Sequence, residues 1–337
     1  MAFPLRFEPY ETTESVPNVV VDGSPNPATT LSLTHWPRLP APPDLADDLS
    51  AQIAFRYLDR GADRHGAAEV VTNNHYDQDG LVSAFVLTDP DEAMRRRALL
   101  EDIAAAGDFA TYRDRTAARV SKVLSAFTDP DRSPLAPLPE DYPEMCSLLY
   151  REVLGRLPEL IDNIDDYQDF WADEDHQLTV SEAALGSGAA TIAEDADLDL
   201  AIVTVTGDLG ALSGHRFGGR SYQGFHPMAL NNATDRVALV LLRGRTYRFT
   251  YRYEGWVQFC SRRVRPRVDL EPLAVRLTER ETAGAVWTST AVSDITPELF
   301  TVDGAESSIT PNDFVATVSD HLRTAPPAWD PWVTSTG

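Results

Sequence analysis

A chain of 337 residues is longer than one ordinary domain core, so its length favours two domains or one elaborated α/β domain. Hydrophobic residues make up 43% of the chain, but no apolar stretch approaches the roughly 20 residues that a membrane helix requires. The net charge of −23 disfavours binding to long nucleic acid. The N-terminus lacks the apolar core of a signal peptide and only two cysteines are present, so we expect a cytoplasmic protein.

The first part of the chain alternates predicted strands and helices. Three runs rich in β-branched or apolar residues are predicted strands: residues 18–23, 30–34 and 69–74. Residues 44–60 place their apolar side chains on one helical face, with Asp44 as the expected N-cap. Helical periodicity then dominates from Gly80 to about Leu160. This alternation predicts a mainly parallel sheet flanked by helices.

The chain beyond about residue 178 is richer in predicted strands. Residues 198–206 and 236–242 are β-branched runs, and residues 246–253 with 255–260 are expected to form a half-exposed hairpin. Residues 270–277 are a predicted helix. We therefore expect an α/β fold whose parallel sheet is followed by a second, strand-richer α/β domain. The expected divisions are 1–170, 178–323 and a loosely ordered tail, 324–337.

Polar residues with ligand chemistry follow the third predicted strand. His75, Asp77 and Asp79 alternate there, and residues at i, i+2 and i+4 of an extended segment point to the same side. Ligands of open parallel sheets lie outside the carboxyl ends of the strands. One imidazole with two carboxylates suits a divalent metal. Gly80 would let the backbone turn sharply before a helix that begins near Leu81. The alternative is a polar strand-to-helix turn, with Asp79-Gly80 as turn residues and Asp77 capping the helix.

Asp22 and His35 each end a predicted strand. If these strands are parallel neighbours of the third, both side chains reach the same edge as His75. His35 is a candidate for a catalytic role, and the alternative is a structural histidine before Trp36 and Pro37. His215 and His226 lie in a glycine-rich stretch and are candidates to line a pocket, but we favour a solvated surface loop there.

The run from Asn74 to Ser83 resembles the first motif of the DHH phosphoesterase superfamily, an apolar strand followed by H-x-D-x-D-G-x-x-S. The resemblance implies a metal-dependent phosphohydrolase that uses Mn²⁺ or Mg²⁺ and acts on a small phosphoester or phosphoanhydride. By position, His75 and Asp77 would hold one ion and Asp79 the other. Asp108 is the nearest match to the isolated aspartate of the second motif and is a candidate catalytic residue, although its surroundings also fit the end of a helix.

A second segment resembles the substrate-binding domain that commonly follows a DHH domain. It contains S-x-R at Ser261 and Arg263, followed by D-L-x-x-L-A, and the resemblance implies that these two residues bind substrate. Four arginines between residues 262 and 267 would form a surface for phosphate or carboxylate. The alternative is an arginine-rich edge strand that resists aggregation. The expected partner is a small phosphorylated substrate; we expect no membrane association and allow for a homodimer.

The chain departs from the superfamily pattern in two places, and we interpret it as a divergent bacterial member. The DHH triplet is absent, with Asp175-His176 as the nearest substitute, and the glycine-rich G-G-G-H is missing. The alternative function is therefore a catalytically weak metal-binding or ligand-binding relative. An enzyme requires at least two further Asp or His side chains within bonding reach of His75 and Asp79. A purely structural protein would instead have these residues bonded to backbone or arginine partners.

Overall fold

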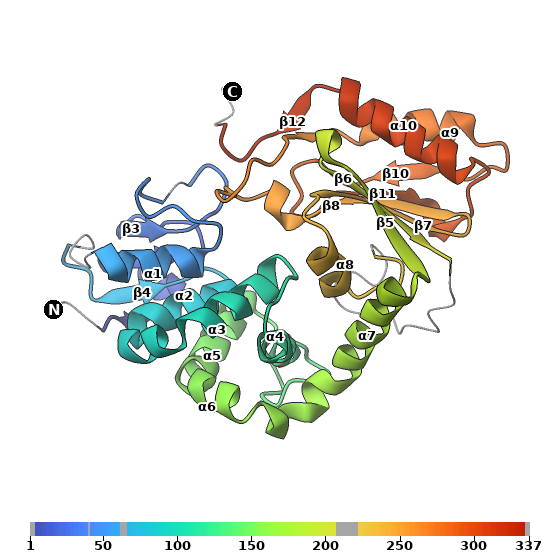
Figure 1. The fold of residues 1–337 in the computed structure, drawn as a ribbon. Helices are drawn as coiled ribbons and strands as arrows, with labels where there is room; N and C mark the ends of the chain where they lie inside the picture. Colours follow the sequence, from blue (N-terminus) through green and yellow to red (C-terminus); the bar gives the residue numbers. More distant parts are fainter. Residues whose placement is uncertain (1–3, 40, 61–65, 207–221, 334–337) are drawn as a thin grey trace. The chain divides into compact units, whose positions relative to one another are not determined.

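The computed structural model describes residues 4–39, 41–60, 66–206 and 222–333. It shows an α/β protein with a parallel sheet and a second, strand-rich mixed sheet, which confirms the predicted fold class (Figure 1). The chain divides into two compact units, residues 1–175 with 258–261 and residues 176–257 with 262–337. No sequence pattern predicted that residues 258–261 pack with the first unit. Within the described ranges, no helix is long and apolar enough to cross a membrane.

The sheet of the first unit has four strands in the order β1-β4-β2-β3, and every neighbouring pair is parallel. Their bounds are β1 (Arg6–Phe7), β2 (Asn18–Val21), β3 (Thr29–Leu33) and β4 (Val70–Thr72). The valines of β2 are completely buried, as expected for a strand whose two faces are both covered. Parallel pairing puts the carboxyl ends of β2, β3 and β4 at one edge of the sheet, as predicted.

Helices cover this sheet, and α2 packs against β1, β2 and β4 (Figure 1). The α-helices that begin in this unit are α1 (Ser50–Arg60), α2 (Gln78–Thr88), α3 (Pro90–Asp108), α4 (Arg115–Phe127), α5 (Tyr142–Val153), α6 (Leu157–Asp162) and α7 (Gln168–Ser187), and α7 contains the boundary between the units. The prediction that Asp44 caps α1 is wrong. The helix starts at Ser50, where the carboxylate of Asp79 accepts hydrogen bonds from the first amides.

The start of α2 also differs from the extended segment expected around Asp79. Asp77 is the N-cap and its Oδ1 accepts a hydrogen bond from Gly80 N at 2.8 Å, so Asp79 and Gly80 lie in the first helical turn. Close packing, and not a sharp bend, explains the glycine. A Cβ at Gly80 would lie 2.3 Å from Asn73 Nδ2 and 2.8 Å from Tyr150 Oη.

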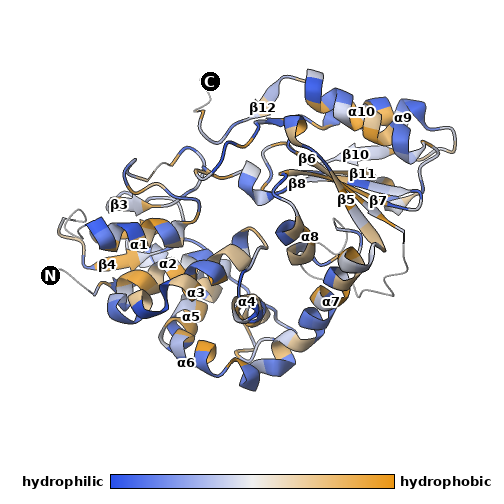
Figure 2. Ribbon diagram, viewed as in Figure 1, coloured by the Kyte–Doolittle hydropathy of each residue, from blue (hydrophilic) through white to orange (hydrophobic). Residues whose placement is uncertain are grey.

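The second unit is built on a six-stranded sheet in the order β10-β11-β8-β7-β6-β5, in which only β6 and β7 pair in parallel. Its elements are β5 (Ala190–Asp195), β6 (Leu200–Val205), α8 (Pro227–Ala233), β7 (Ala238–Arg243), β8 (Thr246–Tyr251), β9 (Arg267–Val268), α9 (Glu271–Arg280), β10 (Trp287–Ser289), β11 (Glu298–Thr301), α10 (Pro311–Thr324) and β12 (Pro327–Trp329). Hydrophilic and hydrophobic residues alternate around α9 and α10 (Figure 2), and their buried residues share one core with β7 and β8.

Short 3₁₀ helices complete the described elements of both units: η1 (Tyr10–Thr12), η2 (Leu154–Arg156), η3 (Ile164–Tyr167), η4 (Ala196–Leu198), η5 (Tyr253–Gly255) and η6 (Val302–Gly304).

Two expectations for the second unit are wrong. The hairpin is formed by β7 and β8, whose turn contains Gly244 with a φ of 59°, and residues 255–260 form no strand. Residues 327–329, expected in a loosely ordered tail, form β12, which pairs with β9. That partner is distant in the sequence, so local patterns did not indicate it.

The predicted arginine surface is largely used inside the second unit. Arg262 NH1 lies 3.4 Å from Asp199 Oδ2, and Arg265 donates to the carbonyls of Asp197 and Leu322. Arg267 is completely buried, and its guanidinium donates to the carbonyls of Arg252, Asp294 and Ile295 at 2.7–3.0 Å. Burial lowers the pKa of Arg267 to about 10. This side chain is therefore a structural crosslink.

We predict that Arg267→Met lowers the free energy of unfolding of the second unit by about 3 kcal/mol, because the carbonyls of Arg252, Asp294 and Ile295 lose the charged donor that binds them. Urea denaturation of the full chain, followed by tryptophan fluorescence, measures the change. The exposed Arg263 is the matched control, and Arg263→Met should change stability by less than about 0.5 kcal/mol. Equal effects of the two substitutions would contradict the crosslinking role.

Candidate metal centre

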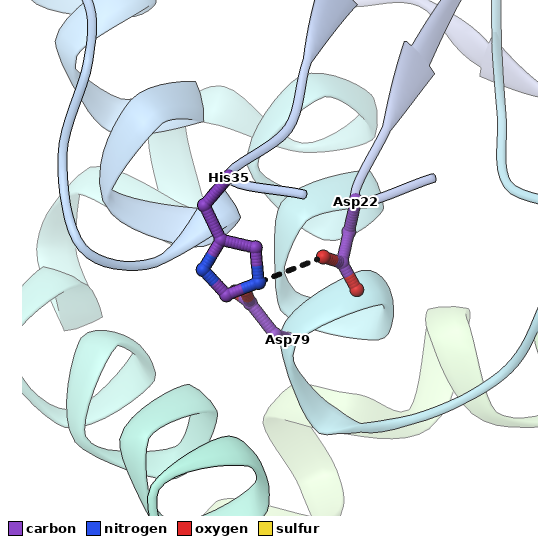
Figure 3. Close-up of side chains that lie close together, drawn as sticks. All are labelled: Asp22, His35 and Asp79. Carbon is purple, nitrogen blue, oxygen red and sulfur yellow. Dashed lines mark ion pairs between the residues drawn. The ribbon is translucent and has the colours of Figure 1, made fainter. Parts of the chain in front are cut away.

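Asp22 and His35 meet at the carboxyl edge of the parallel sheet, as the sequence predicted (Figure 3). Asp22 directly follows β2, and His35 lies just beyond β3. Their side chains are 1% and 0% exposed, and His35 Nε2 lies 3.4 Å from Asp22 Oδ1. Side chains from two neighbouring strand ends are thus brought together in the interior of the unit.

Two further carboxylates approach the same imidazole nitrogen. His35 Nε2 lies 3.8 Å from Asp79 Oδ2, which comes from the first turn of α2, and 3.4 Å from Asp108 Oδ2. Asp108 is the last residue of α3, as its surroundings suggested. The end of α3 packs closely against the start of α2, since the glycine at position 107 leaves room for Gln78. A Cβ at Gly107 would lie only 2.6 Å from Cβ of Gln78. Asp22, His35 and Asp79 together form what we call the inner group, whose ligand atoms lie within 4.8 Å of one another.

A second set of ligand atoms, the outer group, consists of Asp22, His75 and Asp77. His75 Nε2 lies 3.2 Å from Asp22 Oδ2 and 3.0 Å from Asp77 Oδ2. The side chains of His75 and Asp77 are 17% and 33% exposed, so solvent reaches this group. The expectation that His75, Asp77 and Asp79 line one pocket from an extended segment is therefore wrong. The helical start at Gln78 turns Asp79 toward the inner group.

Asp22 belongs to both groups, because its Oδ1 faces His35 while its Oδ2 faces His75. Its backbone has a φ of 44°, in the left-handed region that non-glycine residues rarely occupy. Such backbone strain persists only where surrounding structure over-determines it, and it concentrates at functional sites. The carboxylate is therefore held in a defined position between two imidazoles.

Residues 48–51, at the start of α1, support the inner group. His35 Nδ1 donates to the carbonyl of Asp48 at 2.5 Å. Because a carbonyl only accepts hydrogen bonds, Nδ1 carries a proton. In its neutral form, His35 therefore has its lone pair on Nε2, the nitrogen that could bind a metal. The Ser50 hydroxyl donates to Asp22 Oδ1 at 2.8 Å. The amides of Ser50 and Ala51 donate to the two oxygens of Asp79 at 2.8 and 2.7 Å.

The cluster concentrates negative charge in a buried place. Among the described residues, Asp22, Asp77 and Asp79 form ion pairs with histidines but with no arginine or lysine. Burial, together with the carboxylates of Asp77 and Asp79, raises the pKa of Asp22 well above its ordinary value. Burial also raises the pKa of Asp79, against the opposing effects of His35 and two backbone amides. Without a cation, the inner group therefore tends to retain protons.

His75 and Asp77 shift in opposite directions. Burial alone would lower the pKa of His75, but the carboxylates of Asp77 and Asp22 outweigh it and raise that pKa well above its ordinary value. The pKa of Asp77 is lowered, because His75 and the Gly80 amide outweigh the effect of burial. A divalent cation can take the place of the retained protons, since metal ligands bind in their deprotonated forms. Either group could hold a metal ion.

Other residues named from the sequence lie elsewhere or take other roles. Ser261 is exposed and its amide donates to Asp48 Oδ1 at 2.8 Å, whereas Arg263 is an exposed side chain of the second unit. Asp175 is bound by basic side chains of α4, with Arg115 Nε at 2.8 Å, and does not substitute for the missing triplet. His226 is buried and its Nδ1 accepts from Met228 N, so it is not on a surface loop. His215 lies outside the described residues.

Sequence reasoning missed Asp48 and Ser50 as parts of the site. Both lie near the start of a helix, where Asp and Ser are ordinary capping residues, so their residue types carried no signal for a metal centre. Asp22 did carry one, because an aspartate before glycine ended a buried strand. Only its position between both imidazoles was not foreseen.

Comparisons with known proteins place the chain in one family. A family of unknown function, DUF6687, matches residues 4–332. No curated protein and no solved structure matches the chain, so the resemblance to DHH phosphoesterases rests on the motifs alone. Because the match extends over nearly the whole sequence, the chain belongs to the family of unknown function DUF6687.

Proposed function

We propose that the chain is a metal-dependent phosphohydrolase that holds a divalent cation at the inner group and another at the outer group. The observation that carries the proposal is the shared position of Asp22, whose oxygens face His35 at 3.4 Å and His75 at 3.2 Å. A carboxylate between two ligand sets is the arrangement of a two-metal hydrolytic centre. Asp22, at 3.2 Å from His75, and His35, at 3.8 Å from Asp79, supply the two further Asp or His side chains that the enzyme hypothesis required.

The donor set favours Mn²⁺ or Mg²⁺. Asp22, Asp77 and Asp79 supply hard carboxylate oxygens and the histidines supply imidazole nitrogens, whereas no cysteine belongs to either group. Carboxylates suit Mg²⁺ and Mn²⁺, while thiolates would favour softer metals. Asp108, at 3.4 Å from His35 Nε2, is positioned to act as an additional ligand of the inner group.

Bound divalent cations would polarise a phosphoryl oxygen and lower the pKa of a water molecule for attack on phosphorus. The protein's own part is to hold its ligands rigidly in place. Asp48 and Ser50 fix the tautomer of His35 and the orientation of Asp22, and the amides at the start of α1 fix Asp79. The partly exposed His75 and Asp77 mark the side from which a small phosphoester or phosphoanhydride would approach.

Two further parts of the proposal rest on sequence features. The S-x-R resemblance supports Ser261 and Arg263 as substrate-binding residues, and Arg263 is exposed as that role requires. The unpaired cysteines, Cys146 and Cys260, fit a cytoplasmic location.

A catalytically weak metal-binding relative is the second candidate function. The observation that favours it is the engagement of both Asp79 oxygens by backbone amides, at 2.7 and 2.8 Å. Each of these oxygens accepts a strong hydrogen bond and therefore donates less electron density to a cation. Binding without turnover would distinguish this candidate from the hydrolase.

We predict that wild-type protein binds Mn²⁺ at both groups, and that Asp22→Asn weakens both because it removes the shared carboxylate. Asp77→Asn should weaken only the outer site. Isothermal titration calorimetry with metal-stripped protein measures affinity and stoichiometry, and the loss per site should exceed about 100-fold, more than is typical for a residue behind the ligands. Asp59→Asn, at a surface ion pair with Arg97, is the control. Selective loss of one site in Asp22→Asn would refute the shared role.

We predict Mn²⁺-dependent release of phosphate or alcohol from at least one substrate in a panel of p-nitrophenyl phosphate, bis-p-nitrophenyl phosphate, pyrophosphate and a dinucleotide. Asp22→Asn should lower kcat/KM by more than about 100-fold, while Asp59→Asn leaves it unchanged. Tight Mn²⁺ binding with no turnover of the whole panel would favour the weakly catalytic relative.

We predict that Mn²⁺ affinity increases with pH. In the metal-free protein the pKa values of Asp22 and His75 are raised, so protons compete with the cation, and the competition weakens as pH rises through these raised values. Titrations at about pH 6 and about pH 8 should differ in affinity by roughly tenfold or more, since each competing proton contributes up to a factor of ten per pH unit. Buffers with different ionisation enthalpies should report proton release on binding, and pH-independent affinity would contradict this account.

A further inference from the structure

A short segment from late in the sequence completes the surroundings of the inner group. Residues 258–261 pack with the first unit, although Val257 and Arg262 on either side belong to the second. The amide of Gln258 donates to the carbonyl of His35 at 2.9 Å. The ring of Phe259 lies edge-on to that of Phe109, with centroids 5.4 Å apart, and Phe109 directly follows Asp108.

Asp48 joins this segment to His35. Its Oδ1 accepts hydrogen bonds from the amides of Cys260 at 2.6 Å and Ser261 at 2.8 Å. Its own carbonyl accepts the Nδ1 proton of His35 at 2.5 Å. Hydrogen bonds to a carboxylate are shorter and stronger than those between neutral groups, so this attachment is firm. One residue thus binds the late segment with its side chain and a ligand of the inner group with its backbone.

The attachment extends to the other ligands of the inner group. Ser50 and Ala51 follow Asp48 closely, and they hold Asp22 through a hydroxyl and Asp79 through two amides. A shift of residues 48–51 would therefore move hydrogen-bond partners of Asp22, His35 and Asp79 together. Residues that hydrogen-bond to metal ligands without binding the metal themselves commonly influence metal affinity in this way.

We propose that Asp48 is a positioning residue that couples the segment 258–261 to the inner group, so that cation affinity depends on this segment being in place. The coupling is reciprocal: a cation that fixes His35 also holds the segment, whose flanking residues belong to the second unit. The cation side of this inference rests on the proposed function. The attachment between the segment and His35 does not.

The first test is hydrogen exchange of the metal-free, full-length protein, read on peptides covering residues 258–261 and 33–36. In Asp48→Ala, both peptides should exchange about tenfold faster or more, the loss expected for hydrogen bonds to a charged acceptor. Asp48→Asn retains an acceptor oxygen and should restore slow exchange. Asp59 forms a surface ion pair with Arg97 at the far end of α1, so Asp59→Ala is the control and should exchange like wild type.

The second test is Mn²⁺ titration of the same variants. Asp48→Ala should weaken binding at the inner group by about 10-fold to 100-fold, and Asp48→Asn should largely restore it. Unchanged exchange of residues 33–36 together with unchanged Mn²⁺ affinity would overturn the inference. If wild type binds no Mn²⁺, the proposed function fails, and the metal-free exchange alone decides the coupling.

A second variant covers the case in which Asp48→Ala does not fold. Phe259→Ala loosens the same segment at its contact with Phe109 and leaves Asp48 unchanged. It should produce the same two effects in smaller measure. If Phe259→Ala matches wild type both in hydrogen exchange of residues 33–36 and in Mn²⁺ affinity, the coupling is contradicted.

Discussion

The mutual repulsion of the buried Asp22 and Asp79 and the partly exposed Asp77, which lie at one edge of a parallel sheet, is the constraint to which the first unit is adapted. Each carboxylate has a different compensation. Asp79 accepts the first amides of α1, Asp77 caps α2, and Asp22 lies between two imidazoles with a hydroxyl on Oδ1. Burying charge in this way is costly unless it is paired and hydrogen-bonded. The local structure of both helix starts follows from meeting that cost.

These compensations do not neutralise the cluster. The N-terminus of a helix contributes about half of a positive charge, so α1 and α2 together offset roughly one of the negative charges. Protonation of both histidines would be needed to offset the others. A divalent cation bound among these ligands would offset the remaining charge, which is why we favour metal binding over a purely structural cluster.

The inner group and the outer group differ in their access to solvent. The inner group is buried and supported on several sides, so its ligands are held rigidly. The outer group includes the partly exposed His75 and Asp77. Support for the inner group comes partly from residues 258–261, while Arg262, Arg265 and Arg267, which follow in the sequence, are bound within the second unit. The late part of the chain therefore contributes backbone amides that support this centre through Asp48.

The sequence by itself determined which residues end the strands of the first sheet. Asp22, His35 and His75 follow β-branched runs, and such runs can be recognised locally because strand propensity is a property of the residues themselves. Once these strands pair in parallel, their carboxyl ends lie at one edge of the sheet. Tertiary structure decided the rest. The start of α2 depends on Asp77 and on packing against Asn73 and Tyr150. The bonds from Ser50 to Asp79 and from Ser261 to Asp48 join residues 29 and 213 positions apart, and hydrogen bonds over such separations leave no periodic pattern in a single sequence.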